Sequence, residues 1–181
     1  KKYISIAKEN TKEYIDLPVN EECIVKEIPR FLKESYPWGG YYARSHPLKE
    51  DLLGSVFLNQ YNYKNISQEW IKLNAIHEAY PGHHVDHVMT VANDMPKVFK
   101  IHSLDSKASP LAEGIAHRSE NLLKNIFDDE FFPLFVLYRR LHTAVRVWTD
   151  LLIHHFKEGE ESAIEVYQNK LNLSYEEAKG Q

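Results

Sequence analysis

The sequence contains very little cysteine and no long apolar run, and both absences narrow the classes of protein to which it can belong. Cys23 is the only cysteine among the 181 residues, which excludes an internal disulfide and a cysteine-ligated zinc cluster. No apolar run approaches the roughly 20 residues that a membrane-spanning helix needs, so we expect no membrane segment. The net charge of −4 and the lack of a nucleic-acid-binding motif argue against nucleic acid as a partner.

The composition and the two ends of the chain indicate what kind of domain this is. Apolar residues make up 43% and charged residues 27%, which is typical of a soluble globular domain. We expect a single domain over residues 1–181, as the core of a longer helical protein, because the ending YEEAKGQ barely begins a helix. The first residue is Lys1, not Met, so the N-terminus can have been processed, and secretion or a lipid anchor stays open as a location. The single cysteine fits a reducing compartment, which slightly favours the cytoplasm.

Helical patterns dominate from residue 65 onward. Apolar positions recur at helical spacing from Ile66 to Tyr80, and Ser67 or Asn65 is a suitable N-cap. Further helices are predicted over 109–126, over 133–157 and after the capping box of Ser174 and Glu177. Before residue 65 the pattern predicts a short helix over 21–34, a loop in PWGGYYARSHP and one strand over 55–61. The sequence thus predicts a mainly α domain with at most a small β element near residues 55–61.

The ten histidines are concentrated, and five of them lie between residues 77 and 102. His77 and Glu78 begin the segment HEAYPGHH, which resembles the start of the zinc-protease motif HExxH. The fourth residue after His77 is Pro81, however, and proline cannot bind a metal. On a straight helix His83 would point about 240° away from His77, and His84 would lie about 10.5 Å further along the axis.

The Pro81-Gly82 pair supplies a distortion that can remove this obstacle. Proline clashes with the carbonyl four residues earlier, here that of His77, and glycine permits unusual backbone angles. We therefore predict a bulge that returns His83 to the face of His77, with His84 as the alternative ligand. The competing interpretation is a helix–loop–helix with surface histidines, and His87 and His102 are not expected to be ligands.

A third ligand is needed, and catalytic zinc sites often take a carboxylate. In AEGIAHRSE, Glu113, His117 and Glu120 share one helix face. Glu113 is the predicted third ligand, and Glu120 is predicted to orient a ligand histidine. The same spacing is also typical of a solvated acidic face.

The long helix near the C-terminus carries Arg146, Asp150 and His154 at successive steps of four residues. Such a series commonly forms a ladder of ion pairs. Because Val147 and Leu151 between them are apolar, part of this face is expected to pack on another element. Asp150 could then orient a ligand histidine, and Arg146 or His154 could bind substrate or stabilise an oxyanion.

The three blocks HEAYPGHH, EGIA with its following Glu120, and RVWTDLLIH resemble, in this order, those of the bacterial domain of unknown function 885 family. Its members read HEAxPGHHLQ, EGWALYxE and RLVxDxGLH. This chain departs from them at Asp86, Ile115 and Arg118, which concerns the shape of a substrate pocket more than the metal. The family's proteins are also much longer than this chain.

The resemblance implies a helical metallopeptidase-like domain, similar to gluzincin-type peptidases, with the metal-binding helix at its centre. It implies one zinc ion on His77, His83 or His84, and Glu113, with Glu78 as general base. The expected substrate is a peptide or a small amide. The alternatives are a metal-dependent hydrolase of other amides or esters, and a non-catalytic domain that keeps the peptidase fold.

Overall fold

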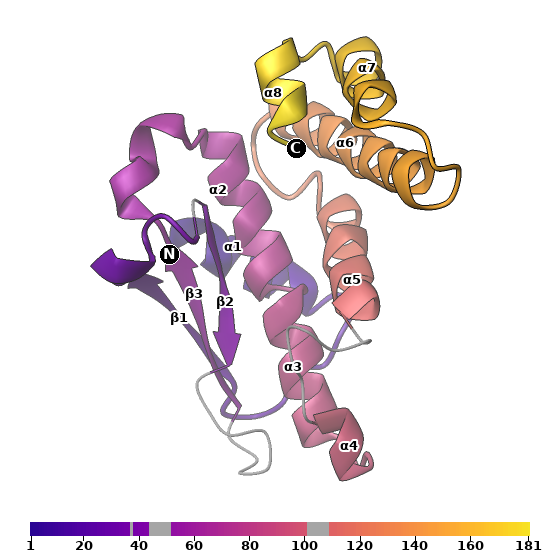
Figure 1. Cartoon of the computed structure of the whole chain (residues 1–181). Coiled ribbons are helices and arrows are strands. Elements are labelled where there is room, and N and C mark those ends of the chain that lie inside the picture. Colours follow the sequence, from indigo (N-terminus) through magenta and orange to yellow (C-terminus); the bar gives the residue numbers. More distant parts are fainter. Residues whose placement is uncertain (37, 44–51, 101–108) are drawn as a thin grey trace. The chain divides into compact units, whose positions relative to one another are not determined.

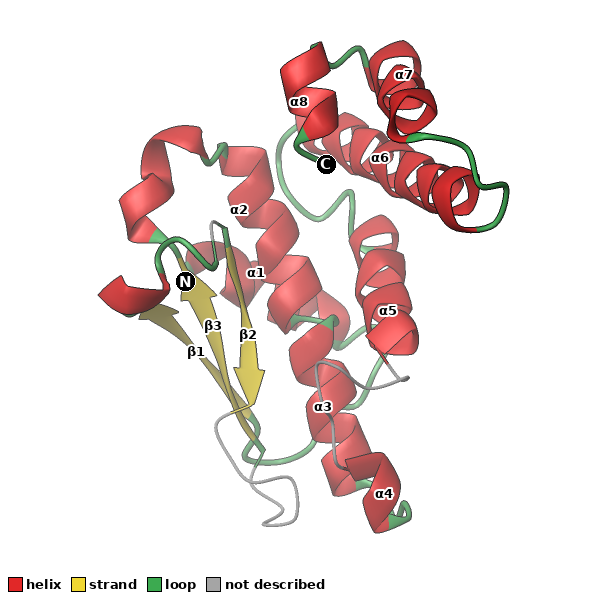
Figure 2. Cartoon of the chain, viewed as in Figure 1, coloured by secondary structure: helices red, strands yellow, loops and turns green. Residues whose placement is uncertain are grey.

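The computed structural model describes residues 1–36, 38–43, 52–100 and 109–181. The chain divides into two units, Lys1–Pro133 and Leu134–Gln181, each with its own internal contacts. Both are built mainly of helices, and a single small sheet lies in the first unit, as the sequence predicts (Figure 2). The predicted single domain stays a prediction.

The first unit contains the sheet and the HEAYPGHH segment. Its helices are α1 (Lys2–Thr11), α2 (Gln68–Asn74), α3 (His83–Ala92), α4 (Lys97–Lys100) and α5 (Ser109–Leu122). The first unit also has two short 3₁₀ helices, η1 (Arg30–Leu32) and η2 (Gln60–Asn65). A π-helical turn, η3 (Ala75–Ala79), follows α2 directly and leads to α3. The strands are β1 (Glu22–Glu27), β2 (Gly39–Ala43) and β3 (Leu53–Leu58).

The sheet has the order β1-β3-β2, with β1 parallel and β2 antiparallel to β3. The predicted strand near residues 55–61 is therefore the central strand and begins two residues earlier. The predicted helix over 21–34 is wrong, because Ile24 and Val25 are β-branched and pair with Ser55 and Val56 of β3. The predicted loop is wrong over Gly39–Ala43, which forms the edge strand β2; residues 37 and 44–47 of that prediction lie outside the described residues.

The α2–η3–α3 segment lies between strand β2 and helix α5 (Figure 1). Ser67 is the N-cap of α2, since its hydroxyl accepts a hydrogen bond from the Trp70 amide. Leu73, Ile76 and Val88 are buried along this segment, and burying each such side chain stabilises the fold by about 2 kcal/mol. The α2–η3–α3 segment is thus part of the core of the first unit.

The second unit packs three helices around a small core. They are α6 (Phe131–His154, whose first turn belongs to the first unit), α7 (Glu160–Leu171) and α8 (Tyr175–Lys179). Its core consists of Val145, Ile164, Tyr167, Leu171 and Ala178. The predicted capping box is confirmed, as Ser174 and Glu177 each accept from the other's backbone amide.

Two predicted helix limits differ from the structure. Helix α5 ends at Leu122, not at residue 126. Helix α6 runs from Phe131 because Asp129 accepts from the Phe131 amide, and it ends at His154, three residues before Lys157 adopts a left-handed conformation. Over the residues that the structure describes, no helix combines the length and apolar character needed to cross a membrane.

Candidate metal centre

The turn after α2 is wider than an α-helical turn, and this width brings two histidines together. The Tyr80 amide donates to the Ala75 carbonyl at 3.2 Å, and the Gly82 amide donates to the Ile76 carbonyl at 3.0 Å. These bonds span five and six residues instead of four, as in the π-bulges that recur at functional sites. The rings of His77 and His83 consequently lie 4.9 Å apart, centroid to centroid.

Gly82 is required because the chain passes directly over the preceding turn. A Cβ atom at this position would collide with the carbonyl groups of His77 and Ile76, which are backbone and cannot move aside. The Tyr80–Pro81 peptide bond is cis, and α3 begins at His83 immediately after Gly82. The predicted bulge thus occurs at the Pro81-Gly82 pair. Glycine is needed there because its backbone lies too close to the carbonyl groups of His77 and Ile76 for a side chain to fit.

Glu113 of α5 contacts both imidazoles. Its Oε2 atom lies 3.3 Å from His77 Nε2, and its Oε1 atom lies 3.4 Å from His83 Nε2. Both distances exceed those of good hydrogen bonds, which are about 2.7–3.2 Å. A tetrahedral zinc ion keeps its ligand atoms roughly 3.4 Å apart when each lies about 2.0–2.2 Å from the metal. Each separation from Glu113 therefore suits a shared zinc ion, but the two contacts use different oxygens of Glu113. Among the described residues, the groups whose ligand atoms all lie within 4.8 Å of one another are His77, Glu113 and His117, and His77, Glu78 and His83.

Glu120 supports His77 from the opposite side of the ring. Its Oε1 atom lies 2.6 Å from His77 Nδ1, and its side chain is only 1% exposed. A carboxylate at Nδ1 fixes a proton there, so that Nε2, which lies beside Glu113, would be the nitrogen that offers its lone pair to a metal ion. The predicted orienting role of Glu120 requires a contact of this kind, and the role itself stays a prediction.

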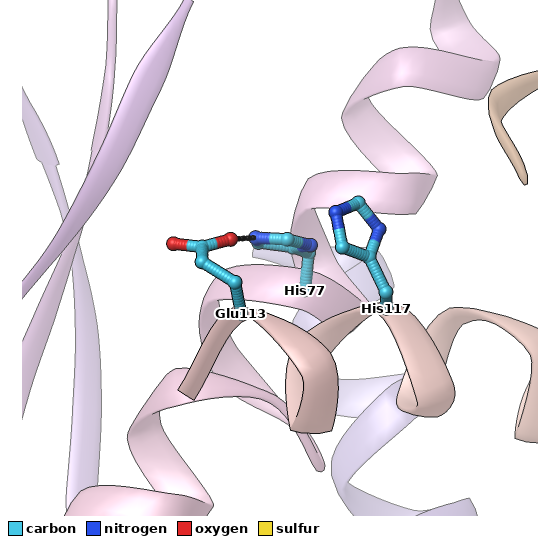
Figure 3. A group of neighbouring side chains, drawn as sticks. All are labelled: His77, Glu113 and His117. Carbon is cyan, nitrogen blue, oxygen red and sulfur yellow. Dashed lines mark ion pairs between the residues drawn. The ribbon is translucent and has the colours of Figure 1, made fainter. Parts of the chain in front are cut away.

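His117 joins this group, although we assigned it no role from the sequence. Its Nδ1 atom lies 3.3 Å from Glu120 Oε2, and its ring lies 5.1 Å from that of His77. Figure 3 shows Glu113 and His117 on successive turns of α5, both beside His77, and the ligand atoms of these three residues lie within 4.8 Å of one another. The signal in the sequence was the spacing of four residues between Glu113 and His117.

Glu78 lies next to His77, and His77, Glu78 and His83 form a second group with ligand atoms within 4.8 Å. Burial raises the pKa of Glu78, and the nearby Glu113 and Glu120 raise it further against the lowering effect of the two histidines. Burial lowers the pKa of His77, but its contacts with Glu113 and Glu120 raise it to about 10. The carboxylates thus create a strong preference for positive charge at this position.

His84, the alternative ligand, belongs to a different cluster. Its ring is fully buried, its Nε2 atom lies 2.8 Å from Glu21 and its Nδ1 atom lies 3.2 Å from the Tyr41 hydroxyl. Both nitrogens are therefore engaged away from His77. His87 is also buried, and His102 lies outside the described residues.

Arg146, Asp150 and His154 lie in the second unit, whereas the cluster around His77 lies in the first. They share one side of α6 and line a groove of about 550 Å³ formed by α6, α7 and α8. Asp150 and His154 are mostly exposed, with 3.7 Å between Oδ1 and Nε2. Their predicted roles at the metal stay predictions.

Comparison with known proteins agrees with the resemblance of the three sequence blocks. None of the curated proteins matches the chain. A solved structure, "the putative lipoprotein from Colwellia psychrerythraea", superposes with a TM-score of 0.77 at 21% identity. The match covers 99% of this chain but only 30% of the length of that one, and at this identity it shows the fold alone. The model of the bacterial family of unknown function DUF885 matches residues 1–181, so the chain belongs to this family.

Proposed function

We propose that the chain carries the centre of a zinc-dependent hydrolase that cleaves peptide bonds. One observation carries this proposal: the Glu113 carboxylate faces the Nε2 atoms of His77 and His83 at 3.3 and 3.4 Å, while Glu120 holds His77 from behind at 2.6 Å. Two imidazoles and one carboxylate are the ligands of many catalytic zinc sites, which keep a fourth position for water or substrate.

His77, His83 and Glu113 would hold the metal. A zinc ion there would supply Lewis-acid activation of a water molecule and of the scissile carbonyl group. The side chain of Glu113 is 55% exposed, so water and substrate can approach the ligands from its side. The buried Glu120 keeps the ring of His77 in the orientation that directs Nε2 towards the metal.

Glu78 would act as the general base. It accepts the proton of the attacking water and later delivers it to the leaving nitrogen, which completes the cleavage of the amide. Burial raises the pKa of Glu78, which is the direction that favours uptake of a proton by a general base.

The edge strand β2 is a better candidate than the central strand β3 for aligning an extended peptide. From the sequence we considered the strand near residues 55–61 for this role, but β3 already pairs with β1 on one side and β2 on the other. Strand β2 is the last strand of the sheet and packs beside η3 and α3, which carry His77 and His83. Main-chain pairing of a peptide with β2 would bring it to the metal centre.

The test is the substitution Glu78→Gln, assayed on zinc-loaded protein with a panel of peptides, small amides and esters. We expect peptide hydrolysis to fall about 10²–10⁴-fold while zinc binding is retained. The control is Glu69→Gln, the same change in the first turn of α2, which should leave hydrolysis unaltered. Retained hydrolysis in Glu78→Gln would exclude Glu78 as the base.

The panel also separates the alternatives. Cleavage of small amides or esters without peptides would assign a different substrate class to the same metal centre. Zinc binding with no hydrolysis of any substrate would favour the non-catalytic interpretation.

A further inference from the structure

A second cluster of carboxylate, imidazole and phenol groups lies inside the first unit and includes Tyr80 and His84 of the HEAYPGHH segment. Glu21, just before β1, is its centre, and its side chain is only 3% exposed. Its Oε2 atom accepts from the Tyr80 hydroxyl at 2.6 Å and lies 2.8 Å from His84 Nε2. Its Oε1 atom lies 2.5 Å from the ammonium group of Lys8 in α1.

The two partners of Oε2 lie on either side of the metal-binding turn. Tyr80 immediately precedes Pro81, and His84 immediately follows the ligand His83. One carboxylate oxygen therefore holds both ends of the short segment that returns the chain to His77. Since burial gives the carboxylate no water to exchange with, these hydrogen bonds are costly to break.

The rest of the cluster fixes His84 from its other nitrogen. The Tyr41 hydroxyl of β2 lies 3.2 Å from His84 Nδ1. Gly54 of β3 leaves room for this contact, because a Cβ atom there would collide with both side chains. With both ring nitrogens engaged, His84 is an anchor for the start of α3 and not a ligand.

We propose that Glu21 is a positioning residue for the metal centre: by holding Tyr80 and His84, it sets the turn that directs His83 towards His77 and Glu113. This inference rests on the proposed function, because it assigns Glu21 to the zinc site. Glu21 touches neither the metal nor the substrate and acts through the backbone of the turn.

A purely structural role would also make Glu21 substitutions destabilising, so a matched control is required. The salt bridge between Lys72 and Asp129 provides it, because it is also largely buried and joins α2 to the start of α6 in the same unit. Asp129→Asn and Glu21→Gln make the same change to a carboxylate that pairs with a lysine. Only the second lies at the metal-binding turn.

The experiment measures zinc affinity by competition with a chelator, and unfolding by denaturant, for the wild type, Glu21→Ala, Glu21→Gln, Tyr80→Phe and Asp129→Asn. We expect Glu21→Ala to bind zinc about tenfold more weakly or worse. Glu21→Gln should recover much of this affinity, because its amide can still hydrogen-bond to Tyr80 or His84. Asp129→Asn should lose stability but retain wild-type zinc affinity.

Tyr80→Phe removes a single hydroxyl group from the cluster and keeps the ring, so it decides the question if Glu21→Ala does not fold. A measurable loss of zinc affinity in Tyr80→Phe supports the positioning role. Unchanged affinity in the folded Glu21 and Tyr80 variants, or an equal loss in Asp129→Asn, would overturn it and leave the proposed function intact. Failure of the wild type to bind zinc would overturn both.

Discussion

His83 and His84 are neighbours in the sequence but belong to two clusters of opposite character. His83 faces Glu113, whose side chain is 55% exposed and lies 3.3 and 3.4 Å from two imidazole nitrogens. His84 faces Glu21, which is 3% exposed and lies 2.6 and 2.8 Å from its phenol and imidazole partners.

The two clusters use the same residue types, so distance and access decide what each can do. Short hydrogen bonds to a buried carboxylate satisfy every partner and leave no position for an ion, which makes the Glu21 cluster an anchor. The separations of 3.3 and 3.4 Å around the accessible Glu113 are longer than good hydrogen bonds and suit ligand atoms of a zinc ion, as we propose. Three changes test this contrast, in order of expected effect.

Gly82→Ala should have the largest effect, because the turn between the two clusters cannot close over a Cβ atom. The new methyl group would collide with the backbone carbonyl of His77, and we expect a loss of about 4 kcal/mol or more in the free energy of unfolding. Zinc binding should be lost with it. Denaturant unfolding and zinc titration measure both.

Gly114→Ala is the control for that change. No atom lies within 4 Å of a Cβ atom at this position in α5, and alanine favours a helix over glycine by about 0.5–1 kcal/mol. This variant should be as stable as the wild type or more so, and it should retain zinc. Equal behaviour of the two glycine variants would refute the close approach at Gly82.

The pH dependence of the unfolding free energy should show the second largest effect, because it reports the ionised Glu21 of the buried cluster. Burial raises the pKa of Glu21, but contacts with His84, Lys8 and Tyr80 lower it from 4.5 to about 2. A lowered pKa in the folded state means that the ionised group contributes stability above pH 4.5, and that this contribution is lost as the pH falls towards 2. The shift corresponds to about 3 kcal/mol.

The measurement is the difference in unfolding free energy between the wild type and Glu21→Gln at each pH. It should stay constant from about pH 7 to pH 5 and shrink from about pH 5 to pH 3. Taking the difference cancels the titration of carboxylates shared by both proteins. A constant difference over the whole pH range would show that ionised Glu21 does not stabilise the fold through this cluster.

Glu120→Gln should have the smallest effect of the three, since it alters the support of a ligand and not the ligand itself. The amide keeps the shape but weakens the contact with His77 Nδ1, and we expect a loss of about 10–100-fold in zinc affinity. Competition with a chelator measures this. An unchanged affinity would mean that another group sets the orientation of His77.

The sequence predicted the helices that follow Ser67 and Ser174 and the return of His83 towards His77, because their causes are local, whereas it did not predict α1 or α7. Ser67 and Ser174 cap the helices that follow them, and the Pro81-Gly82 pair distorts its own turn. Strands β1 and β2 were missed because each exists through pairing with β3. Their short sequences show no alternation that would distinguish them from a helix or a loop.

The Glu21 cluster could not be predicted from the sequence because it, too, depends on contacts between distant parts of the chain. Glu21 and His84 are 63 residues apart along the chain, and nothing in the residues around Glu21 indicates that a histidine will meet it. That Glu113 and Glu120 lie close together was easier to predict, because their spacing of seven residues places them on one face of one helix. Which of the two adjacent histidines contacts Glu113 depends on the tertiary fold.

The zinc content of the purified protein tests the central claim most directly, measured by elemental analysis for the wild type, His83→Ala and His84→Gln after exposure to zinc. The account predicts roughly one zinc per chain in the wild type and in His84→Gln at saturating zinc, and almost none in His83→Ala. No zinc in the wild type, or equal zinc in His83→Ala, would contradict it.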